Sequence, residues 1–158
     1  MKVIKVLQII ILSVVTIIFC LTSYLLLNPQ IKKQLTVNSF KNDAESMEAI
    51  AREWNSLNYT YMFTDKEKFE AGLIVTGYNP NDNISVANCK YDLENLLINK
   101  KYKYIMKSNN AVFFTKYASL GNGYGIAFSE DGNKPQNEFI LSSEKTDSSG
   151  KWYFYIMR

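Results

Sequence analysis

The longest apolar stretch of the chain lies near its start. Residues 6–27 carry no charged side chain, and most of them are Leu, Ile, Val or Phe. A helix of that length spans roughly 33 Å, close to the ~30 Å hydrocarbon layer of a bilayer. An apolar helix in a soluble core keeps a polar stripe, and this stretch has none. The pattern therefore predicts a transmembrane helix over residues 6–27.

A cleaved secretion signal is the alternative interpretation of this stretch. Lys2 and Lys5 supply the cationic start of such a signal, but the apolar run exceeds the usual ~7–15 residues. The bulky residues 24–27 also offer no cleavage site. We therefore expect an uncleaved signal anchor, with residues 1–5 as a cytoplasmic tail and the rest of the chain outside the cytoplasm. The charge bias behind this orientation is weak, because lysines flank both ends.

A second helix is predicted after a polar neck over residues 28–38. Pro29 lacks an amide donor, so the first helix should break or kink there. Ser39 is expected to cap the new helix, Asp43 to lie near the positive end of its dipole, and Asn58 to end it. Apolar residues recur at steps of three and four, the period of one helix face, and we expect this face in the core, with partner binding as the alternative. They are Phe40, Ala44, Met47, either Ile50 or Ala51, Trp54 and Leu57.

Further along, short apolar runs alternate with turn-forming residues. Connections rich in Gly, Asn and Asp predict hairpin loops between strands. In residues 152–157 both faces are apolar or aromatic, so this strand should be central, with helices on at least one side. The sequence predicts an α+β domain over residues 39–158, with about two helices packed on an antiparallel β-meander. Strands are expected over 59–63, 71–78, 102–107, 111–118, 124–129, 138–145 and 152–157, and a helix over 89–100.

Composition narrows the possible functions. The 131 residues after the apolar stretch suffice for one domain, and their 16 basic and 15 acidic side chains give no basis for nucleic-acid binding. The chain has no His, which excludes histidine-based catalysis and His-ligated zinc. Cys20 lies in the predicted span, so Cys89 has no partner for a disulfide. An exported domain without disulfides favours a bacterial cell surface.

Three short motifs suggest chemistry but fit simpler interpretations. Residues 121–125 (GNGYG) lie between predicted strands, whereas a phosphate loop needs a helix after the glycines, so a hairpin turn is expected. Ser142 and Lys145 match a serine–lysine motif, but residues three apart in a strand point to opposite faces. Residues 79–83 carry a single carboxylate, too few for calcium. We predict no catalytic residue, cofactor or metal site.

Tyrosines are the remaining candidates for a binding surface. Ten of the 11 tyrosines follow the apolar stretch, and tyrosine is enriched at contact surfaces because it buries a large area at a small entropy cost. Ordinary sheet packing is the alternative. The predicted partner-contact surface consists of Tyr102, Tyr104, Tyr117 and Tyr124.

Together these patterns favour a non-catalytic binding domain of the bacterial envelope. We expect a single-pass membrane protein held in lipid by residues 6–27, whose outer domain meets another envelope protein or a wall component. The alternative is a structural accessory subunit of a secretion, conjugation or pilin-like assembly. That alternative rests on similarity of outline alone, because a long first helix followed by an antiparallel sheet is common to many such subunits.

Overall fold

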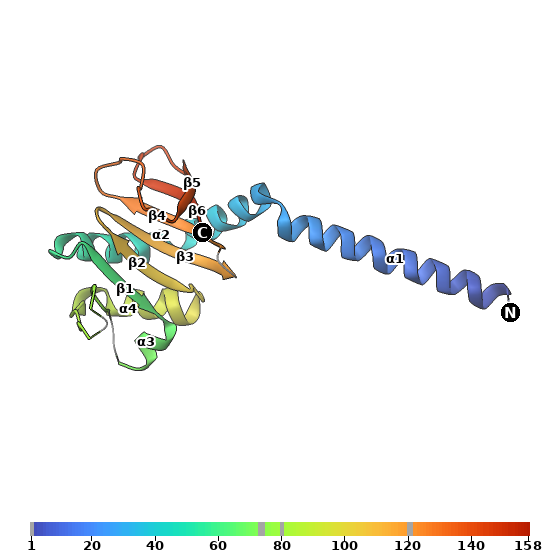
Figure 1. Ribbon diagram of the computed structural model, residues 1–158, viewed down its shortest axis with the longest axis horizontal. Helices are drawn as coiled ribbons and strands as arrows, with labels where there is room; N and C mark the ends of the chain where they lie inside the picture. The colour runs from blue at the N-terminus through green and yellow to red at the C-terminus, as the bar shows by residue number, and fades with distance from the viewer. Residues whose placement is uncertain (1, 73–74, 80, 120–121) are drawn as a thin grey trace. The chain divides into compact units, whose positions relative to one another are not determined.

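A computed structural model describes residues 2–72, 75–79, 81–119 and 122–158 (Figure 1). The chain divides into two compact units, Met1–Leu35 and Thr36–Arg158, which are described separately. In the first unit, helix α1 covers Lys2–Leu27, and its side chains are described from Ile10 to Tyr24. Within the described part of the chain, no helix is both long and apolar enough to qualify as a membrane span.

The break predicted at the first proline is confirmed. Helix α1 ends before Asn28, and helix α2 covers Pro29–Ser56. The side-chain oxygen of Asn28 accepts a hydrogen bond from the backbone N–H of Gln30 at 2.9 Å, which caps the new helix. Proline suits the first helical position because its missing N–H has no partner there in any helix.

The predicted start of the second helix at Ser39 is wrong. Ser39 lies inside α2, and its hydroxyl donates to Asp43 at 3.4 Å instead of capping the helix. Residues 30–38 include Gln, Lys and Leu and no Gly or Pro, so nothing in their local preference stops a helix. The stretch predicted as a polar neck is therefore helical.

The second unit contains a six-stranded antiparallel sheet in the order β1-β2-β3-β4-β6-β5. This confirms an α+β domain. The first four strands follow one another across the sheet, but β6 lies between β4 and β5, so the predicted meander fails at the connection from β4 to β5. The strand at residues 152–157 is interior, as expected from its two apolar faces. The strands are β1 Tyr61–Asp65, β2 Tyr104–Ser108, β3 Ala111–Ser119, β4 Asn122–Ser129, β5 Ile140–Lys145 and β6 Trp152–Met157.

Both outer strands of the sheet are irregular. Phe63 of β1 exchanges two backbone hydrogen bonds with Thr76, at 2.8 and 2.9 Å, in an isolated bridge. This bridge and a turn at residues 71–72 replace the strand predicted over 71–78, of which residues 73–74 lie outside the described residues. On the opposite edge, the register of β5 against β6 shifts between Ile140 and Ser142.

The helix predicted over residues 89–100 is confirmed in three short parts. A 3-10 turn, η1 (Ala87–Cys89), leads into α4 (Lys90–Glu94) and a π-helical turn, η2 (Asn95–Asn99). A further short helix, α3 (Lys66–Glu70), was not predicted; Asp65 caps it by accepting a hydrogen bond from the N–H of Lys68 at 2.8 Å.

The main core lies between the helices and one face of the sheet, which we call the helix face. Met47, Ile50 and Trp54 of α2 are fully buried, as the predicted apolar stripe requires. Leu93 of α4 and Leu96 and Leu97 of η2 join the same cluster. From the strands it includes Met62, Ile105, Val112, Phe114, Ile126, Phe128, Trp152 and Phe154.

Candidate functional site: the second face of the sheet

The other side of the sheet, here called the second face, holds a smaller cluster of its own. Strand register aligns Met106, Phe113, Ala127 and Tyr153 in one row across β2, β3, β4 and β6. Side chains alternate between faces along each strand, so this row lies opposite the helix face. The buried members of the cluster are Met106, Ala111, Phe113, Ala127, Tyr153, Tyr155 and Met157.

Tyrosine hydroxyls on the second face are hydrogen-bonded within the protein. The hydroxyls of Tyr155 and Thr115 share a hydrogen bond of 2.5 Å in the interior, and burial raises the pKa of Tyr155 well above its ordinary value. Tyr153 donates to the carbonyl of Gly132 at 2.6 Å. The hydroxyl of Tyr104 lies 2.9 Å from the sulfur of Met157. These contacts fix the orientation of the aromatic rings.

Two glycines of β4 lie where a side chain would be crowded. Gly125 lets the backbone of β4 approach that of β3 closely, and Gly123 leaves room for the side chains of Tyr104 and Met157. A Cβ at Gly125 would lie 2.0 Å from the carbonyl oxygen of Phe114, so no side chain fits there. A Cβ at Gly123 would lie 3.5 Å from the Tyr104 hydroxyl and 3.2 Å from Cγ of Met157. Gly123 was expected in a hairpin turn but belongs to the strand, whereas Gly125 also lay in the strand predicted over residues 124–129. Gly121 lies outside the described residues.

Four aromatic residues form an edge of this face that we call the aromatic rim: Tyr61, Phe63, Tyr78 and Tyr104. Ring centroids are 5.2 Å apart for Tyr61 and Tyr78, and 5.6 Å apart for Phe63 and Tyr104. Three members are half-buried, whereas Tyr78 is 79% exposed. Burial raises the pKa of Tyr61, with smaller contributions from Tyr104 and Tyr78. The rim therefore presents ordered aromatic rings to solvent.

The structure does not bring the four predicted contact tyrosines together. Tyr104 belongs to the aromatic rim. Tyr102 is only 3% exposed and joins the core on the helix face, where its hydroxyl donates to Asp43 at 2.9 Å. Burial, followed by the nearby Asp43 carboxylate, raises the pKa of Tyr102. Tyr102 precedes β2, so the two-residue alternation assumed for it does not apply.

Tyr117 and Tyr124 form a separate pair. Their rings stack with centroids 4.7 Å apart, and Tyr124 packs against the core on the helix face. A β-bulge between Thr115 and Tyr117 shifts the alternation of β3 and places Tyr117 beside Tyr124. Tyr61 and Phe63 of the rim were missed as site residues, although the predicted strand over 59–63 already alternated aromatic residues with others.

Two charged residues are buried on the helix face, and both have structural partners. Lys107 is 4% exposed, and its ammonium donates to the carbonyls of Trp54 and Leu57 at 2.7 and 3.1 Å, at the end of α2. Burial lowers the pKa of Lys107. Asp43 also forms an ion pair with Lys100 at 3.2 Å. These contacts tie α2 to the sheet, and they account for both charges without a catalytic role.

The described residues offer no activated nucleophile among the candidates raised by the sequence. Cys89 is buried, and burial, followed by Glu53, raises the pKa of its thiol, which keeps the reactive thiolate scarce. Over the same described ranges, no three Cys, Asp or Glu side chains gather closely enough to hold a metal ion.

Comparisons of the chain with family models, with curated proteins and with solved structures find no match.

Proposed function

We propose that this protein is a non-catalytic binding domain of a bacterial envelope, anchored by residues 6–27 and facing away from the cytoplasm. The single observation that carries the binding proposal is the aromatic rim. Half-exposed Tyr and Phe rings on a sheet bury a large area on contact and lose little conformational freedom, because their neighbours already hold them. The proposed partner is another envelope protein with an apolar patch that fits these rings.

The anchor is supported by the uninterrupted apolar sequence of residues 6–27, which matches a bilayer in length. Carbonate washing of vesicles containing the full-length chain tests it. We expect the protein to stay in the membrane pellet and an external protease to cleave the domain on intact cells. Release into the aqueous phase, or protection of the domain while an external control is cleaved, would contradict this proposal.

Site-specific photo-crosslinking in cells tests the binding surface. A photoreactive residue at Tyr78 should yield a discrete crosslinked envelope protein, because this ring projects most from the rim. Tyr91 of α4 is the matched control, since it is also 79% exposed but lies outside the rim. Tyr61→Ser should lower the yield at Tyr78, because Tyr61 holds the Tyr78 ring in place.

Equal crosslinking at Tyr78 and Tyr91 would contradict a contact surface at the rim. A yield at Tyr78 that Tyr61→Ser leaves unchanged would do the same. Crosslinks to lipid alone would show that the rim faces the membrane rather than a protein.

A further inference from the structure

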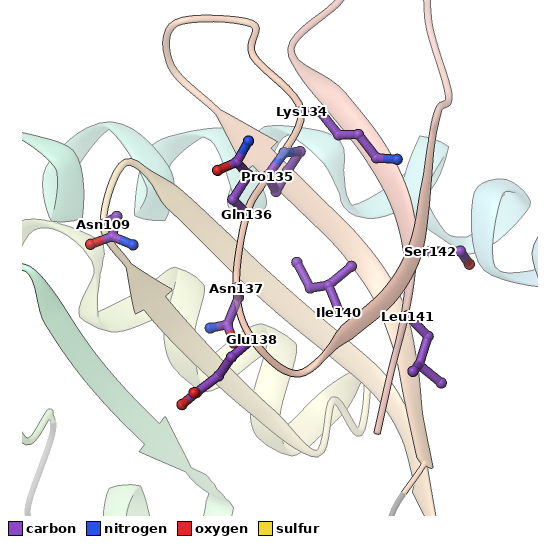
Figure 2. A pocket seen from close by; sticks show the side chains of 9 residues that line it. All are labelled: Asn109, Lys134, Pro135, Gln136, Asn137, Glu138, Ile140, Leu141 and Ser142. Atoms are coloured by element: carbon purple, nitrogen blue, oxygen red, sulfur yellow. The ribbon is translucent and has the colours of Figure 1, made fainter.

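Two adjoining hollows open beside the second face, near the turn between β2 and β3. Their volumes are ≈ 580 and ≈ 500 Å³, and both are lined by Asn109, Lys134 and Gln136. Figure 2 shows the segment 134–138 crossing in front of the sheet, with Asn109 on the neighbouring turn and Ile140 on β5. We call the combined hollow the polar cleft. It is large enough for one or two sugar rings.

Side-chain amides dominate the polar lining of this cleft. Asn109, Gln136 and Asn137 contribute to the larger hollow, and Asn110 and Asn133 to the smaller one. Each amide offers both donors and an acceptor. Within the described part of the chain, the side chains of Asn109 and Gln136 have no hydrogen-bond partner. They are therefore available to a ligand that carries both donors and acceptors.

Asp131 holds the smaller hollow in shape. Its carboxylate accepts hydrogen bonds from the Ser129 hydroxyl at 2.8 Å, from the Asn110 amide at 2.5 Å, and from both the backbone and the side chain of Asn133 at 2.9 Å. These bonds lower the pKa of Asp131 to about 2. Asp131 therefore stays ionised, its oxygens are already hydrogen-bonded, and it holds the side chains of Asn110 and Asn133 in position.

The charged groups of the cleft are few. Lys134 supplies one positive group, and Glu138 and Asp131 supply one negative group each, so the lining carries a net charge of about −1. A single lysine beside two carboxylates does not favour an anion, and within the described residues no three carboxylates gather to hold a metal ion. The many amides of the lining therefore favour an uncharged polar ligand.

Apolar side chains complete the lining. Pro135, Ile140 and Leu141 border the larger hollow, and Ile140 also packs against the second-face cluster. A sugar ring combines an apolar C–H face with hydroxyls that both donate and accept hydrogen bonds. Amides, carboxylates that can accept hydrogen bonds from hydroxyls, and an apolar border are complementary to that combination.

We propose that the polar cleft binds a neutral saccharide. An extended peptide fits less well, because such peptides pair with a regular sheet edge or insert side chains into apolar pockets. The β5 strand that borders the cleft is out of register at Ile140 and Ser142, and the lining mixes amides with apolar groups. This proposal does not depend on the aromatic rim, because none of the four rim residues lines the cleft.

Titration of the full-length chain with two neutral probes tests the proposal. The protein is purified in a detergent without a sugar headgroup, and N-acetylglucosamine trimer and maltotriose are added in turn. Side-chain amide signals in ¹⁵N–¹H spectra report on binding. We expect at least one probe to shift the signals of Asn109 and Gln136 in a saturable way.

Three variants locate the binding. Asn109→Gly removes an amide and suits the left-handed backbone at this position, where φ is 55°. Asn109→Gly and Gln136→Ala should each weaken binding about five- to tenfold, the usual effect of losing one neutral hydrogen bond. Asn42→Ala removes an exposed amide from α2 and should leave the affinity unchanged.

Several results would overturn the saccharide proposal. One is the absence of any shift with either probe in the millimolar range. Another is saturable binding of inorganic phosphate that Lys134→Ala abolishes, which would assign the cleft to anions. A third is tighter binding of an uncharged peptide of similar size, which would assign it to a protein segment. Weakening by Asn42→Ala to the same degree would show that the probes bind elsewhere.

Discussion

The two faces of the sheet are built by different means. On the helix face, α2, α4 and η2 cover the strands, and aliphatic side chains and Trp54 fill the space between them. On the second face, aromatic rings cover the strands, with Tyr104 and Tyr155 fixed by hydrogen bonds to Met157 and Thr115. Because the helix face holds the larger buried cluster, we expect it to contribute most of the stability, and residues at the edge of the second face to be less constrained by folding. Surfaces for partners are therefore expected on the second face.

Truncating one aromatic residue on each face tests this contrast most directly. Trp54→Ala removes a fully buried side chain and should lower the free energy of unfolding by about 3–5 kcal/mol. Phe63→Ala in the half-exposed rim should lower it by about 1 kcal/mol. Urea denaturation of the two purified full-length variants measures the difference. Equal losses would show that both faces contribute alike to stability.

Adding one methyl group to each glycine of β4 separates a backbone conflict from a side-chain conflict. Gly125→Ala should destabilise the fold by about 3 kcal/mol, because the new Cβ would collide with the Phe114 carbonyl. Gly123→Ala should cost about 1 kcal/mol or less, since the side chain of Met157 can move away. Thermal unfolding of both variants checks the order. A Gly123→Ala variant as unstable as Gly125→Ala would indicate a rigid Tyr104–Met157 contact.

Replacing Lys107 by Met tests the polar anchor on the helix face. The change removes the ammonium donor from the carbonyls of Trp54 and Leu57, of which Leu57 keeps the N–H of Tyr59 at 2.8 Å, and should lower the free energy of unfolding by about 2 kcal/mol. Denaturant titration gives the size of the loss, and amide hydrogen exchange shows whether the end of α2 opens first. Unchanged stability would mean that the cost of burying the ammonium cancels its hydrogen bonds.

The smallest expected effect is a change in the pH dependence of the free energy of unfolding, caused by Asp131. Because the pKa of Asp131 is lowered from 3.8 to about 2 in the folded protein, its contribution to stability is complete above pH 3.8 and is lost as the pH falls through about 2. Asp131→Asn should therefore be less stable than the parent at pH 6, and the gap should close toward pH 2. Glu138→Gln removes an exposed carboxylate that forms no ion pair within the described residues, and is the control. A gap that stays constant with pH would contradict this role.

Local patterns predicted the strands well, because the signals that mark a strand and its flanking turns lie within short segments of sequence. Alternation of side chains and glycine- or asparagine-rich loops placed β2, β3, β4, β5 and β6 within two residues of their observed starts. The order of the strands in the sheet could not be predicted in the same way. The connection over residues 130–139 carries the chain past the position of β6 before β5 forms, and no local pattern indicates how far a loop reaches.

The candidate site was predicted only in part, for reasons visible at single residues. Tyr102 was placed on a strand face, but Lys101 adopts a left-handed backbone with φ of 59° just before it, so the regular alternation starts later, at Tyr104. Asp43 was interpreted as a dipole partner because the helix was expected to start at Ser39. Its contact with Tyr102 joins residues 59 positions apart and cannot be inferred from spacing along the chain.

The irregular outer strands bear on how copies of this chain can associate. The outward N–H and C=O of Phe63 are occupied by Thr76, and the shifted register of β5 interrupts the opposite border. Among the residues that the structure describes, neither edge strand offers an unbroken row of free backbone N–H and C=O groups with which a strand from another copy could pair. Growth of fibres by strand donation is therefore disfavoured at both edges of the sheet.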